Sequence, residues 1–122
     1  MEEIVLSEKD IESLEWIKLP FLGCTVKFLG RSEENGTCGF LIEMEPGAEL
    51  PQHGHPSIEQ CLGLNGEIEI KGKKYGPGSY FINPPANEHG PFKAGTNGWM
   101  AYITFDGPNG MEEMVGIQTI KK

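Results

Sequence analysis

The chain has 122 residues, a formal net charge of −8 and three cysteines. This length predicts one domain, residues 1–122, which can bury a core without disulfides or a structural metal. Nucleic acids and anionic membranes attract clustered Lys and Arg, so an acidic chain of this kind is expected to bind neither. The cysteines form no Cys-x-x-Cys pair, and there is no signal-like segment after Met1 and no apolar run that could span a bilayer. Together these features predict a reduced, cytoplasmic protein.

The predicted elements are mostly short strands, because 17 glycines and nine prolines interrupt the apolar runs. One short helix is expected over residues 7–14, where Ser7 and Asp10 can form a capping box. The strands expected after it, in chain order, cover residues 15–18, 25–29, 38–45, 58–62, 67–71, 79–83 and 99–105. Asn-Gly pairs at 35–36 and 65–66 predict hairpin turns, and Gly72 predicts a further tight turn.

The alternation within residues 38–45 indicates which side chains face the core. Phe40, Ile42 and Met44 alternate with Glu43 and Glu45, so the apolar set is expected to point inward. Strands at this spacing, with no crossover helix between them, predict an all-β antiparallel sandwich or barrel. Residues 115–120 could add one more strand near the C-terminus.

All three histidines fall within one pattern. His53 and His55 are followed by Glu59, with Gly47 before them and Gly66 after them, and His89 lies further along the chain. Residues i and i+2 of a strand point to the same face, so His53 and His55 would direct both imidazoles into one space. Neutral imidazole is the commonest protein ligand for transition metals, and a carboxylate completes a mixed nitrogen and oxygen set. The alternative is that these are ordinary surface or core histidines.

This pattern resembles the cupin family. Its first motif, G-x5-H-x-H-x3,4-E-x6-G, matches from Gly47 to Gly66 at every fixed position. Its second motif, G-x5-P-x-G-x2-H-x3-N, matches at Gly78, Pro84 and His89. Ala86 replaces the second glycine of that motif and Lys93 replaces its asparagine, whereas the ligand position is kept.

The resemblance implies a cupin double-stranded β-helix, or jelly-roll barrel, whose motifs cover about residues 20–106. The tails, residues 1–19 and 107–122, would pack on the barrel or contact a second copy, since small cupins often pair terminal strands in a homodimer. The stretches LPFLGCTVKFLGRSEENGTCGFLIEMEPGAELPQHGHPSIEQCLGLNGEIEI and GSYFINPPANEHGPFKAGTNGWMAYITFDGP are similar to small ChrR-like cupins. That group includes iron-dependent enzymes that cleave β-diketones and zinc-binding domains of anti-sigma factors. The anti-sigma factors carry a helical domain ahead of the cupin, for which this chain is expected to have no room.

The resemblance also implies the roles of the site residues. His53, His55 and His89 would hold one divalent metal, and Glu59 would be a fourth ligand or would act catalytically from beside the metal. Iron(II) is favoured, with zinc, nickel and manganese as alternatives. Phe40, Tyr80 and Tyr102 are expected in the pocket wall, although ordinary core is the alternative for such residues. Strand alternation places Cys61 on the same side as Glu59, as a pocket candidate or a small core residue.

Three imidazoles and a carboxylate inside a barrel leave coordination positions open, which favours a catalytic or ligand-binding metal over a structural one. The resemblance then implies a dioxygenase that cleaves or oxidises a small enolisable or dicarbonyl compound. The substrate would chelate the metal through two oxygens. The alternatives are a non-catalytic small-molecule or metal-sensing module and a metal-dependent isomerase or decarboxylase, because the cupin fold hosts many reactions.

Overall fold

The computed structural model describes residues 3–85 and 88–111. It begins with helix α1, Glu8–Ser13, whose N-terminus carries the predicted capping box: Asp10 N donates to Ser7 Oγ at 3.1 Å, and Ser7 N donates to Asp10 Oδ2 at 2.9 Å. The buried Lys27 attaches this helix to the sheet, because its Nζ donates to the Ile11 carbonyl oxygen at 2.8 Å. The predicted N-terminal helix is therefore confirmed.

Eight antiparallel strands, which hold about half of the described residues, build the body of the structure. They are β1 Ile17–Lys18, β2 Cys24–Arg31, β3 Cys38–Met44, β4 Glu49–Leu50, β5 Glu59–Ile70, β6 Lys73–Tyr75, β7 Tyr80–Asn83 and β8 Phe92–Phe105. The fold is the predicted all-β architecture. No helix in the described part of the chain is long and apolar enough to cross a membrane.

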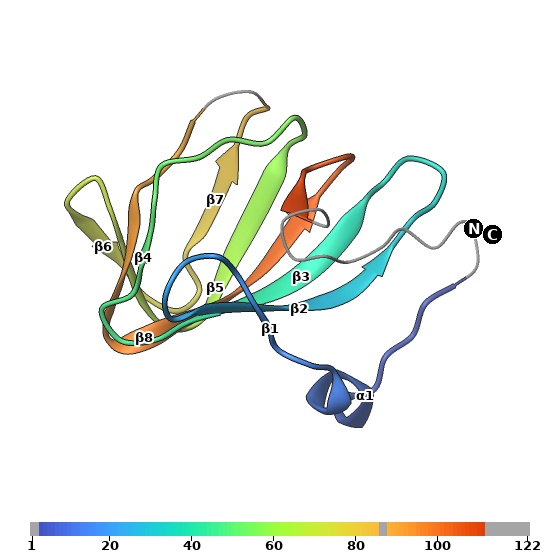
Figure 1. Ribbon diagram of the computed structural model, residues 1–122, viewed down its shortest axis with the longest axis horizontal. Helices are drawn as coiled ribbons and strands as arrows, with labels where there is room; N and C mark the ends of the chain where they lie inside the picture. The colour runs from blue at the N-terminus through green and yellow to red at the C-terminus, as the bar shows by residue number, and fades with distance from the viewer. Residues whose placement is uncertain (1–2, 86–87, 112–122) are drawn as a thin grey trace.

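The two long strands, β5 and β8, pair with each other at the centre of the sheet, and each also pairs with strands on both sides of the barrel. The strand order is β1-β2-β3-β8-β5-β6, with β4 also paired to β8 and β7 also paired to β5. Figure 1 shows β2 and β3 on one side of this central pair and β4 and β6 on the other. One end of β8 pairs with β3 and the other with β4, so a single strand serves both sides of the barrel.

The predicted hairpin at Asn65-Gly66 is wrong, because β5 runs through this position without a turn. The register with β8 shifts between Gly63 and Asn65 and again between Gly66 and Ile68, so the residues form bulges. An Asn-Gly pair supplies the positive φ that a bulge also needs, and Gly66 has φ 71°. The other turn predictions are confirmed: Asn35-Gly36 separates the paired strands β2 and β3, and Lys71-Gly72 closes the β5–β6 hairpin.

The core lies on the inner face of the strands. Phe40, Ile42 and Met44 are fully buried, which confirms the predicted alternation in β3. β8 begins at Phe92, seven residues before the predicted strand. Thr96, Asn97 and Gly98 interrupt its apolar pattern at a register shift, and the pairing with β5 resumes at Ala94, Lys93 and Phe92. The extra strand predicted over residues 115–120 lies outside the described residues.

Candidate metal centre

His53 and His55 lie in the connection between β4 and β5, and His89 lies just before β8. The prediction that His53 and His55 lie on a regular strand is wrong, because no strand forms between β4 and β5. Pro51 and Pro56 lack the N–H groups that a strand ladder needs. One isolated bridge replaces it: His53 N donates to His89 O at 3.0 Å, and His89 N donates to His53 O at 2.7 Å. This bridge holds two histidines that are far apart in the sequence directly opposite each other.

Backbone carbonyl groups set the tautomers of two of the imidazoles. His53 Nδ1 lies 2.7 Å from the Pro51 carbonyl oxygen, and His55 Nδ1 lies 2.8 Å from the Asn109 carbonyl oxygen. A carbonyl oxygen can only accept, so Nδ1 carries the proton and donates in both residues. The lone pair of each neutral ring is then on Nε2, which is the arrangement of a metal-binding imidazole.

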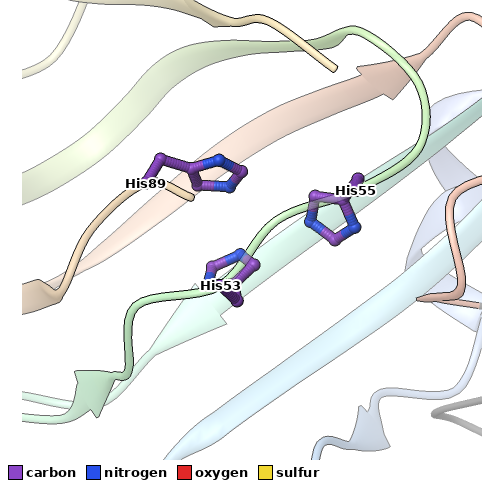
Figure 2. A group of neighbouring side chains, drawn as sticks. All are labelled: His53, His55 and His89. Atoms are coloured by element: carbon purple, nitrogen blue, oxygen red, sulfur yellow. The ribbon is translucent and has the colours of Figure 1, made fainter. Parts of the chain in front are cut away.

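The three imidazoles converge. One ring nitrogen of each histidine lies within 4.8 Å of the others. The ring centroids of His53 and His89 are 4.4 Å apart, and Figure 2 shows all three rings turned toward a common space. This group could hold a metal ion, as the sequence predicted.

The buried ring nitrogens show whether a metal fits the group. Among the described residues, none hydrogen-bonds His55 Nε2 or either ring nitrogen of His89, although these atoms are out of contact with solvent. A buried polar atom without a partner costs about 1–3 kcal/mol, and a bound cation would remove that cost. Burial, with the neighbouring imidazoles, also lowers the pKa of His53, which keeps the ring neutral and its lone pair available. The residues present therefore fit a transition metal.

Glu59 begins β5 and lies at the edge of this group. Its Oε1 is 3.1 Å from His89 Nε2, without hydrogen-bond geometry, and its Oε2 is 3.9 Å from His55 Nε2. Oε1 also accepts a hydrogen bond from Asn83 Nδ2 at 2.8 Å. Burial by itself would raise the pKa of Glu59, but the close His89 imidazole and the Asn83 amide outweigh it and hold the pKa below its usual value. A buried, ionised carboxylate thus faces two of the imidazoles.

Aromatic side chains that the sequence did not single out enclose the histidines. Phe92 packs against the rings of His53 and His89, with centroids 5.8 and 5.7 Å away. Phe105 packs against His55 at 4.7 Å. Both residues belong to β8, and their positions follow from its pairing with β4 and β5. Only the strand register reveals them, as it does Asn83, which is paired with Glu59.

The predicted pocket residues mostly lie elsewhere. Phe40 is buried in the core, where its ring contacts Phe105 and not a histidine. Tyr102 pairs with Leu41 and Leu62 on the outer face of the sheet and is 39% exposed, so its predicted place near the metal is wrong. Tyr80 also pairs with Leu62, so its side chain belongs to the outer face, although the residue borders a cavity beside His89.

Cys61 shares the inner face with Glu59, as its alternation predicted. Its side chain is fully buried in the core. Burial and the neighbouring Glu59 carboxylate raise the pKa of the Cys61 thiol, so the thiol is protonated at neutral pH. Cys61 is therefore a small core residue, which was the alternative to its prediction as a pocket residue.

The sequence profile of the ChrR cupin-like domain matches residues 7–107. The chain belongs to the ChrR cupin-like domain family. This cupin matches no protein of curated function at the sequence level.

Solved structures share the fold at low sequence identity. One chain of the crystal structure of Rhodobacter sphaeroides SigE in complex with the anti-sigma factor ChrR is 23% identical to this chain, with a TM-score of 0.67. The match covers 79% of this chain and 51% of that chain. This cupin thus spans about half the length of that chain. An acetylacetone dioxygenase from Acinetobacter johnsonii is 20% identical, with a TM-score of 0.69, over 88% of this chain and 75% of that one. KdgF from Halomonas is 16% identical, with a TM-score of 0.67, over 91% and 99% of the two chains.

Proposed function

We propose that this cupin is a metal-dependent dioxygenase that cleaves or oxidises a small enolisable or dicarbonyl compound. The observation that carries the proposal is the convergence of three buried or half-buried imidazoles, two of which, His55 and His89, have buried ring nitrogens without a hydrogen-bond partner among the described residues. Family membership and the similar fold of an acetylacetone dioxygenase support the choice of reaction.

His53, His55 and His89 would hold one divalent metal through ring nitrogens, with iron(II) favoured and zinc, nickel or manganese as alternatives. When bound, iron(II) would supply Lewis acidity toward two carbonyl oxygens and one-electron chemistry toward dioxygen. The chain would supply the rest of the site. The Pro51 and Asn109 carbonyls orient two imidazoles, and Phe92 and Phe105 keep water away from the rings.

Glu59 would act in one of two ways. Its ionised carboxylate would either complete the ligand set or accept a hydrogen bond from His89 and so fix that ring. Both roles agree with its 3.1 Å approach to His89 and with the Asn83 amide that holds it in place.

The test measures metal content by elemental analysis on the purified protein and on His53→Ala and His89→Ala. The wild type is expected to bind about one metal per chain, and each variant to lose stoichiometric binding while staying folded. Gln52→Ala, an exposed neighbour of His53, is the matched control and should keep its metal. Full retention of metal in both histidine variants would contradict the assignment.

Turnover is tested on protein reconstituted anaerobically with Fe(II) and then exposed to dioxygen. Uptake of one dioxygen per acetylacetone, with release of a two-carbon acid and a three-carbon 2-oxoaldehyde, is the expected result. Metal binding without oxygen uptake would overturn the dioxygenase proposal. Anaerobic turnover of the compound would then favour an isomerase or decarboxylase, and binding without turnover would favour a sensor.

A second candidate function is a metal-binding module that acts through a protein partner. The similarity to the ChrR chain in its SigE complex favours it. This function requires metal binding but no oxygen uptake, so the same two measurements distinguish it from the dioxygenase.

We also propose that this cupin forms a homodimer, as its resemblance to small cupins implied. Support comes from exposed apolar side chains on the outer face of the sheet, among them Leu62, Tyr80 and Tyr102.

A further inference from the structure

A cavity of about 430 Å³ lies beside the histidine group. His89 forms part of its wall, together with Asn83, whose amide donates to Glu59. Cavities of this size hold small organic ligands in many proteins. This cavity thus shares a wall with the candidate metal centre.

The remaining wall is mainly apolar and aromatic. Phe81 and Phe92 contribute nearly parallel rings, with centroids 5.9 Å apart and planes inclined by 22°, and Ile70 lies beside them. Tyr75 is paired with the buried Ile68, so its side chain belongs to the inner face of the sheet. It is nevertheless 36% exposed, which places the ring on the open side of the cavity.

Charge does not dominate this wall. Among the described lining residues, Lys71 and Glu88 are charged and have opposite signs. A ligand with several carboxylates would find one ammonium group offset by one carboxylate. The wall is therefore suited to an uncharged, apolar part of a ligand whose polar end reaches toward His89.

We propose that the substrate is a 1,3-dicarbonyl compound carrying an aryl group, and that the aryl group binds in this cavity against Tyr75 and Phe81. This inference rests on the proposed function, which supplies the dicarbonyl end. An aryl ring fills apolar space that a methyl group leaves empty, and aromatic pairs add attraction beyond the buried area. Tyr75 is then a specificity-determining residue.

The test compares the binding of acetylacetone and 1-phenyl-1,3-butanedione by calorimetric titration. Zinc-loaded protein is used because zinc has no redox chemistry and the ligands stay intact. The wild type is expected to bind the phenyl compound about tenfold or more tightly than acetylacetone. Tyr75→Ala should lose most of this preference. Tyr75→Phe, which keeps the ring, and Leu22→Ala, which truncates an exposed side chain elsewhere, should both retain it.

Equal affinity for the two compounds in the wild type, or an unchanged preference in Tyr75→Ala, would overturn the inference. Its failure can be separated from failure of the proposed function. Iron-dependent oxygen uptake with acetylacetone requires no aryl site, so uptake without a phenyl preference removes only the aryl site. If neither compound binds to zinc-loaded protein, both the inference and the dicarbonyl function are wrong.

Discussion

At the scale of single residues, the candidate centre depends on Asn109, which lies after the last strand, β8. The Asn109 carbonyl oxygen accepts from His55 Nδ1, and the buried Asn109 side chain is itself held at both ends. Its Nδ2 donates to Cys38 Sγ at 3.1 Å, and its Oδ1 accepts from Met111 N at 2.7 Å. The Asn109 side chain thus positions the carbonyl that orients His55.

We expect Asn109→Ala to weaken metal affinity by about 10- to 100-fold, which is typical of losing support behind a metal ligand. The carbonyl group remains, but the side-chain contacts that fix its direction are gone. Competition with a chelator of known affinity measures the change. Asn97→Ala, at an exposed position of β8 away from the histidines, is the control and should leave the affinity unaltered. Equal affinities in wild type and Asn109→Ala would show that the backbone alone positions the carbonyl.

At the scale of elements, the bulged part of β5 lets one strand pair with both β7 and β6. Gly66 is essential to this geometry for two reasons. Its φ of 71° is unfavourable for other residues, and a Cβ there would clash with the Gly98 carbonyl oxygen. Only glycine allows β5 and β8 to approach so closely at this bulge.

Gly66→Ala is therefore expected to destabilise the protein by about 2–6 kcal/mol, since backbone strain and overpacking each cost about 1–3 kcal/mol. Gly72→Ala isolates the backbone contribution, because Gly72 has φ 79° and a methyl group there would meet no heavy atom within 4 Å. We expect it to cost about 1–2 kcal/mol. Urea unfolding of the two variants measures the difference, and similar losses in both would show that the contact with Gly98 relaxes.

At the scale of the whole molecule, the outer face of the sheet carries an apolar row. Tyr80, Leu62, Tyr102 and Leu41 are successive partners across β7, β5, β8 and β3. The first three are 56%, 40% and 39% exposed. A continuous apolar face of this kind is typical of a surface that contacts another protein, and a second copy of the chain is the partner proposed above.

Sedimentation equilibrium at micromolar concentration is expected to show a dimer for the wild type. Leu62→Lys should give a monomer, because a charge at the centre of the row must be desolvated when the copies meet. Leu22→Lys, at a fully exposed position away from the row, should remain dimeric. A monomeric wild type would refute the proposal.

Much of this protein could be predicted from its sequence, because the relevant signals are local. Ser7 and Asp10 are three residues apart, and the side chain of each accepts a hydrogen bond from the backbone N–H of the other. The alternation in β3 identifies its buried face, since successive strand residues point to opposite sides. The histidine spacing likewise predicted the group that the structure brings together.

The features that the sequence left open depend on the pairing of distant segments. Asn65-Gly66 is compatible with a hairpin or a bulge, and the partner strand β8 selects the bulge. Tyr80 and Tyr102 lie on the outer face because strand parity cannot be carried across a loop of unknown geometry. Phe92, Phe105, Asn83 and Asn109 reach the candidate centre through strand register and chain packing. Local sequence specifies the chemistry of each side chain, whereas register and packing determine which side chains meet.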